Sequence, residues 1–120
     1  MRGRVASGRR DLAQWMRRYS DSYERAVGAR LEPGSLNVVL DEPWVMHEPQ
    51  ARLEASEVGV GIAFVPCRLD SERCWVVRTD RNNAGTGNHP LTVVEVVSTV
   101  HLRTALNLQD GDEVTLNLVR

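Results

Sequence analysis

The chain has 120 residues, of which 42% are hydrophobic and 26% are charged, and its net charge is −1. These values are typical of a globular protein with one core, and no stretch approaches the ~20 apolar residues of a membrane span. We therefore expect one domain over residues 1–120, a cytoplasmic monomer without membrane or nucleic-acid partners. All 15 basic residues are arginine, which excludes mechanisms that need a lysine, such as a P-loop lysine on phosphates.

The first quarter of the chain is basic and helical in pattern. Residues 1–30 hold eight arginines and three acidic residues, which gives a net charge of +5. Apolar residues at three- and four-residue spacings predict one long helix over 12–27, with Arg17 and Arg18 on the opposite, polar face. The positive charge is compatible with anion binding, and a solvated helix face is the simpler interpretation. The aromatic residues of the apolar stripe are interpreted as core.

Short strands are expected on both sides of this helix. Before it, residues 3–8 have the pattern of a strand that ends in a turn. After it, apolar runs and alternation predict strands at 37–40, 52–55, 58–65, 74–78, 91–97 and 113–119. A short late helix is expected over 101–106. Many short strands with one substantial helix favour a mainly β fold, a small closed barrel decorated by helices.

Three further features of the sequence call for interpretation. Cys67 and Cys74 lie in the context of an expected hairpin, which would allow a disulfide between them, but a reduced, structural pair is expected in a cytosolic protein. The loop over 80–90 is rich in Asn, Gly and Thr, and loops of this length are usually functional or disordered. Glu95 is embedded among valines and must face water, a partner or a ligand, because an unpaired buried carboxylate is costly.

The turn at Pro33-Gly34 leads into a strand that begins with Ser35 and Asn37. Residues two apart on a strand point the same way, so these side chains would present two neutral oxygens on one side. Such a pair suits magnesium, which keeps waters and takes further ligands from substrate phosphates. The alternative is an ordinary polar junction between a turn and a strand, where Ser and Asn are common.

Two segments resemble the archaeal-type, CTP-dependent riboflavin kinase family. The stretch Pro33-Gly34-Ser35-Leu36-Asn37-Val38 resembles that family's Pro-Gly-Thr-Leu-Asn-Val segment. Residues 93–114 resemble its ending, with Leu102-Arg103 and Asp110-Gly111-Asp112 in the same order. Weaker similarities that extend the resemblance over nearly the whole chain lie at residues 5–8 and 61–66.

The resemblance implies a closed six-stranded cradle-loop barrel of the RIFT type, formed by the whole chain as a riboflavin-kinase-like domain. It implies transfer of the γ-phosphoryl group of CTP to the 5′-hydroxyl of riboflavin, which gives FMN and CDP. The implied small-molecule partners are therefore riboflavin and CTP, the phosphate donor, and the implied cofactor is Mg²⁺.

The family's functional residues can be carried over only where the motifs match. The magnesium-holding Thr and Asn of the family correspond to Ser35 and Asn37, which agrees with the two-oxygen interpretation. Glu95 matches a flavin-binding glutamate, and Thr86 is the nearest match to a flavin-binding threonine. The nucleotide-binding positions implied by the resemblance are Ser7, Gly8, Arg9, Arg10, Val100, His101, Leu102 and Arg103.

The main departure from the family follows Gly8. The family has a Gly-Glu-Gly segment there, whereas this chain has Arg9, Arg10 and Asp11. Glycine lets backbone N–H groups approach phosphates closely, and arginine can replace them with bidentate contacts. Equally, the arginines can mark a protein that has lost or changed its nucleotide. The candidate catalytic residues are Arg103, for stabilising charge, and Asp11, as a general base.

Two alternatives to the kinase remain open at this point. One is a non-catalytic relative, in which the same barrel binds flavin or nucleotide or acts as a regulatory module. The other is a kinase that uses a different nucleotide or acceptor.

Overall fold

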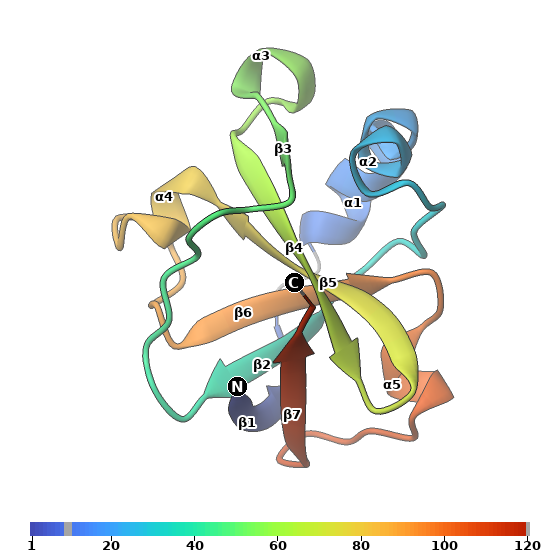
Figure 1. Ribbon diagram of the computed structural model, residues 1–120, viewed down its shortest axis with the longest axis vertical. Coiled ribbons are helices and arrows are strands. Elements are labelled where there is room, and N and C mark those ends of the chain that lie inside the picture. The colour runs from blue at the N-terminus through green and yellow to red at the C-terminus, as the bar shows by residue number, and fades with distance from the viewer. Residues whose placement is uncertain (9–10, 120) are drawn as a thin grey trace.

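The computed structural model describes residues 1–8 and 11–119, without the side chain of Asp11 (Figure 1). In this part of the chain, seven strands form one antiparallel sheet in the order β3-β4-β5-β6-β2-β1-β7, and a further β4–β7 pairing closes six of them into a barrel. The expected mainly β, six-stranded closed barrel is therefore confirmed, with β3 added. The strands are β1 (Arg2–Ala6), β2 (Leu36–Leu40), β3 (Ala51–Leu53), β4 (Ile62–Leu69), β5 (Glu72–Thr79), β6 (Val93–Ser98) and β7 (Glu113–Leu118).

Strand β4 makes closure possible because it changes partner along its length. Residues 62–64 pair with β3, whereas residues 67–69 pair with β7, and β5 follows the whole strand on the other edge. Pro66 lies between the two pairings, where its missing N–H leaves no donor unsatisfied. Its carbonyl oxygen accepts a hydrogen bond from Val119 N at 2.9 Å.

The expected single long N-terminal helix is wrong. The described residues contain α1 (Asp11–Arg18) and α2 (Ser20–Val27), separated at Tyr19, where φ is −117° and ψ is 34°. The break lets both segments follow the curved sheet, so that Met16 and Tyr23 are each buried in the same apolar cluster. The other helices are the single-turn α3 (Ala55–Val58), α4 (Asp80–Asn83) and α5 (Leu102–Ala105).

The strand expected from Val58 begins later, at Ile62. The preceding residues form α3 instead, which ends at Gly59 with φ of 88°. This left-handed conformation suits glycine and stops the helix before the strand can start. No helix in the described part of the chain is long and apolar enough to cross a membrane.

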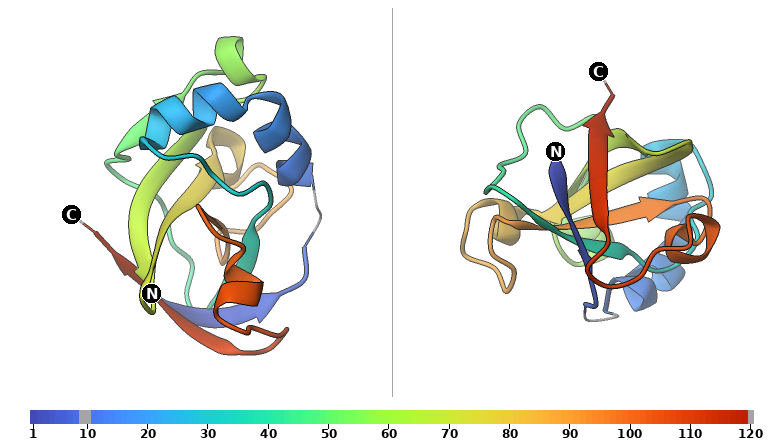
Figure 2. Two further views of the ribbon diagram at one scale, coloured as in Figure 1. Left: turned by 90° about the vertical axis from the view of Figure 1, so that its right-hand side faces the viewer. Right: turned by 90° about the horizontal axis from the view of Figure 1, so that it is seen from below.

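Two apolar clusters lie on opposite faces of the strands. Inward side chains such as Val38, Val76 and Leu116, all 0% exposed, fill the barrel. Outward side chains of β4, β5 and β6 pack against α1 and α2, which cover that side of the barrel (Figure 2). There Tyr23 meets Phe64 edge-on, with ring centroids 5.7 Å apart, a contact that contributes about 0.5–1.5 kcal/mol beyond area burial.

Cys67 and Cys74 face each other across β4 and β5, inside the barrel. They are directly paired in the strand register, both are buried, and both are free thiols. Their hydrogen bond and their burial raise the pKa of Cys67, which keeps the thiol protonated and unreactive.

Candidate functional site

A cavity of about 640 Å³ lies between α1, the turn before β2, and α5. In the left view of Figure 2, the segment that leads from α2 to β2 passes between the N-terminal helices and α5. A volume of this size is typical of small-molecule sites. The polar and charged side chains that line the cavity are Ser7, Arg17, Glu32, Ser35, Asn37, Ser98, His101, Arg103 and Asp110.

Ser35, just before β2, and Asn37, on β2, both lie in the cavity wall. The neighbouring Leu36 and Val38 point into the barrel, so Asn37 points outward, where it is only 6% exposed. Ser35 Oγ donates a hydrogen bond to Asn37 Oδ1 at 3.4 Å. The structure therefore brings together the two oxygens that the sequence spacing pairs.

The Ser35–Asn37 pair fits a magnesium ion that arrives with a nucleotide. Among the described residues, no group of three or more His, Cys, Asp or Glu side chains is arranged to hold a metal. Magnesium retains waters and accepts phosphate oxygens as ligands, so two neutral protein oxygens beside a large cavity are sufficient. They would be a poor set for a metal held by protein alone.

Gly8 packs directly against the amide of Asn37. A Cβ atom added at Gly8 would lie 2.0 Å from Asn37 Nδ2 and 2.4 Å from Asn37 Cγ. No larger residue fits there unless the Asn37 side chain moves. The glycine expected to bind nucleotide thus also fixes the position of the candidate metal ligand.

Asp110 joins the two ends of the chain at the cavity. Its carboxylate accepts a hydrogen bond from Ser7 Oγ at 2.5 Å and forms an ion pair with Arg103 Nη1 at 2.9 Å. Arg103 Nη2 also donates to Ala6 O at 3.4 Å. The hydrogen bond from Ser7, and then the one from Arg103, lower the pKa of Asp110.

We expect protonation of Asp110 to loosen this contact. Because the folded-state pKa is lowered, the carboxylate stabilises the fold above its ordinary pKa, and this stabilisation is lost as the pH falls through the lowered value. In urea unfolding between pH 7 and pH 2, Asp110→Asn should therefore show a weaker loss of stability with acid than wild type. Asp41→Asn removes an exposed carboxylate elsewhere and serves as the control; equal flattening in both variants would contradict the assignment.

Glu95 lies beside the candidate metal pair but does not line the cavity. Strand register pairs it with Asn37 on β2, and directly paired residues on neighbouring strands project to the same face of a sheet. On that face it also lies near Tyr23, whose pKa is raised to about 12 by burial and, secondarily, by the charge of Glu95. The implied flavin and metal positions are therefore neighbours.

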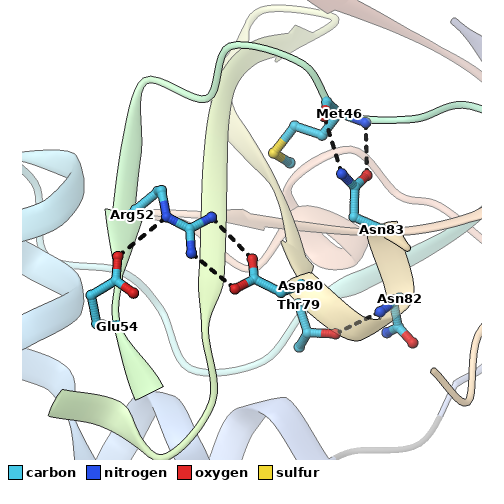
Figure 3. Close-up of polar contacts among 7 residues, drawn as sticks. All are labelled: Met46, Arg52, Glu54, Thr79, Asp80, Asn82 and Asn83. Atoms are coloured by element: carbon cyan, nitrogen blue, oxygen red, sulfur yellow. Dashed lines mark hydrogen bonds and ion pairs between the residues drawn. The ribbon is translucent and has the colours of Figure 1, made fainter. Parts of the chain in front are cut away.

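The loop over 80–90 is ordered by polar contacts rather than apolar ones (Figure 3). Its first residues form α4, and Arg52 holds Asp80 through two hydrogen bonds of 3.0 and 2.9 Å. Asn83 Oδ1 accepts from Met46 N at 2.8 Å, and Asn83 Nδ2 donates to Met46 O at 3.1 Å. The segment thus has anchors that a search for apolar residues misses.

Thr86, the other implied flavin contact, lies in this loop. Its side chain is exposed, and its hydroxyl donates to Arg81 O at 3.2 Å. Thr86 is not part of the cavity wall. Both implied flavin contacts, Thr86 and Glu95, therefore lie outside the wall of this cavity.

The remaining nucleotide candidates divide into two groups. Val100, Leu102 and Arg103 line the cavity, as does His101, whose Nδ1 accepts a hydrogen bond from Thr104 N at 3.3 Å and so caps α5. Arg9, Arg10 and the side chain of Asp11 lie outside the described residues.

Sequence reasoning missed Arg17, Glu32 and Asp110 as members of the site. The position of Arg17 on the polar face of the predicted helix indicated solvent, and Asp110 was assigned no role in binding. A signal was present for Asp110, since its Asp-Gly-Asp segment belongs to the family resemblance.

Fold and site define a small closed antiparallel β-barrel with a polar ligand cavity assembled from both ends of the chain. Residues 5–118 match the family model CTP-dep_RFKase, described as domain of unknown function DUF120. The chain therefore belongs to the CTP-dependent riboflavin kinase domain family.

Curated relatives agree with this membership. Proteins named riboflavin kinase from Methanocella arvoryzae, Methanospirillum hungatei and Pyrobaculum aerophilum are 30%, 29% and 28% identical, each over 98% of this chain. The matched region covers 56%, 57% and 59% of those three proteins, respectively. The chain thus spans little more than half the length of the relatives that it matches.

Proposed function

We propose that this chain transfers the γ-phosphoryl group of CTP to riboflavin. The 5′-hydroxyl oxygen of riboflavin forms the new bond to phosphorus, the bond from the γ-phosphorus to the bridging oxygen breaks, and the products are FMN, CDP and a proton. The barrel formed by residues 1–120 would act as a monomeric cradle-loop (RIFT-type) domain.

The observation that carries the proposal is the convergence of the described metal- and nucleotide-binding candidates on one cavity. Ser35 and Asn37 line it together with Ser7, Gly8 and the segment 100–103. These positions come from both ends and the middle of the chain, and they were selected by motif alone. Convergence of this kind is expected of a binding site and not of scattered surface residues.

In this mechanism the protein contributes mainly positioning and charge, because phosphoryl transfer leaves little covalent work for it. Ser35 and Asn37 would hold magnesium, which when bound neutralises and orients the nucleotide's phosphates. Arg103, fixed by Asp110, would face charge that develops on the leaving CDP. Glu95 and Thr86 would contact riboflavin, and Asp11 is the candidate acceptor of the hydroxyl proton.

A direct test incubates purified protein with riboflavin, Mg²⁺ and either CTP or ATP, and follows FMN by chromatography. We expect FMN with CTP and little with ATP. The Asn37→Ala variant, purified in parallel, controls for contaminating kinases. Flavin binding without FMN from any nucleotide would support the non-catalytic relative instead, an alternative that the replacement of the family's glycine segment by Arg9 and Arg10 keeps open.

The proposed role of Glu95 gives a separate prediction. Glu95→Gln should weaken riboflavin binding about tenfold or more, because hydrogen bonds to charged groups are worth roughly 1.5–3 kcal/mol. Quenching of flavin fluorescence measures this affinity, and CTP affinity should stay unchanged. Glu113→Gln, an exposed carboxylate of β7 that pairs with Arg4, is the matched control. Unaltered riboflavin affinity in Glu95→Gln would remove Glu95 from the flavin site.

A further inference from the structure

Arg17 lies in the wall of the cavity, although its helical position indicated a solvated face. Helix α1 buries Leu12 and Met16, and Met16 Sδ accepts a hydrogen bond from Gly34 N at 3.3 Å. This contact ties the helix to the turn that leads into Ser35. The guanidinium of Arg17 is therefore carried by an element that is fixed to the candidate metal site.

Among the described arginines that line the cavity, Arg17 is the one without an ion-pair partner. In the part of the chain that the structure describes, two arginines and two acidic residues line the cavity: Arg17, Arg103, Glu32 and Asp110. Arg103 is already paired with Asp110. The guanidinium of Arg17, in contrast, forms no ion pair or hydrogen bond with any residue that the structure describes. A polyanion that enters the cavity would meet this unpaired positive charge.

We propose that Arg17 binds the phosphate chain of the nucleotide, an inference that rests on the proposed kinase function. The family's glycine segment, which would present backbone N–H groups to phosphate, is replaced here by Arg9 and Arg10. A guanidinium can supply the lost donors, because it forms paired hydrogen bonds with phosphate oxygens. Arg17 would thus supply phosphate contacts from α1 in a chain that lacks the glycine segment.

The next residue supplies a matched control. Arg18 is on the same helix turn and is also exposed, but it does not line the cavity, and its guanidinium lies 5.3 Å from the centre of the Tyr19 ring. Replacing either arginine by glutamine removes one positive charge from the same end of α1. Only Arg17→Gln removes it from the cavity.

The test measures binding of CTP, CDP and CMP by titration calorimetry, with Mg²⁺, for wild type, Arg17→Gln, Arg17→Lys and Arg18→Gln. We expect Arg17→Gln to weaken CTP binding about tenfold, to weaken CMP binding less, and to reduce the dependence of CTP affinity on salt. Arg17→Lys should recover part of the affinity, and Arg18→Gln should match wild type. Thermal unfolding checks that all variants are folded.

Each other outcome has a definite meaning. Equal losses for CTP and CMP, or equal effects of Arg17→Gln and Arg18→Gln, would overturn the inference and leave the kinase proposal intact. If Arg17→Gln bound CTP as tightly as wild type, the inference would likewise be overturned and the kinase proposal left intact. Failure of wild type to bind any cytidine nucleotide would overturn both.

Discussion

Asn37→Ala should form FMN about 100- to 1,000-fold more slowly than wild type, the scale seen when one preorganised polar group is removed from a transition state. The Asn37 side chain is 6% exposed and sits against Gly8 and Ser35, so packing holds its amide oxygen at the candidate metal position. Initial rates at saturating CTP and riboflavin, measured over a range of Mg²⁺ concentrations, test this. The half-saturating Mg²⁺ concentration should rise as the rate falls.

Ser35 provides the matched pair of controls for the metal site. Ser35→Thr retains the hydroxyl and should stay close to the wild-type rate, whereas Ser35→Ala should lose activity in the same direction as Asn37→Ala. A wild-type rate and Mg²⁺ dependence in Asn37→Ala would show that the metal binds elsewhere. Loss of activity in Ser35→Thr as well would point to crowding and not to loss of an oxygen.

Gly8→Ala should also reduce FMN formation, because the new methyl group would push against the Asn37 amide. The added methyl group would lie 2.0 Å from Asn37 Nδ2, and overpacking of this kind typically costs about 1–3 kcal/mol of stability. Because Asn37 has to move, we expect FMN formation to fall about as far as in Asn37→Ala. Urea unfolding and initial rates measure the two effects separately.

The double variant Gly8→Ala/Asn37→Ala tests the cause. Removing the Asn37 amide relieves the clash, so the double variant should be more stable than Gly8→Ala alone while it remains inactive. Such non-additivity is the signature of two residues in direct contact. Additive stability losses would mean that Gly8 acts through its backbone and not through Asn37.

The pairing of Ser35 with Asn37 was predictable from the sequence because it depends only on local backbone geometry. A strand has a period of two, so Ser35 and Asn37 had to share a side, and the family motif supplied the chemistry. The barrel was predictable for the same reason, since short runs of valine and leucine with turns between them favour strands. Local spacing needs no knowledge of the rest of the chain.

The errors have tertiary causes. The apolar spacing continues across Tyr19 without a change of phase, so the break that fits α1 and α2 to a curved sheet left no trace in the pattern. The strand expected over 58–65 included Gly59, whereas the positive φ of this residue ends a helix. Arg17 is exposed but also lines a cavity, because the turn before β2 and helix α5 contribute residues to the same cavity as α1. In each case the deciding neighbour is distant in sequence, so the local pattern around the residue does not reveal it.

Barrel closure also determines when the site can exist. Ser7 and Asp110 are in contact although they are 103 positions apart, and β1 completes its pairing only with β7. The cavity wall includes Ala6 at the end of β1 and Asp110 just before β7. The wall is therefore complete only when these two ends of the chain lie together, as the β1–β7 pairing places them. A bound nucleotide should therefore slow hydrogen exchange across the whole barrel, including strands that never touch it.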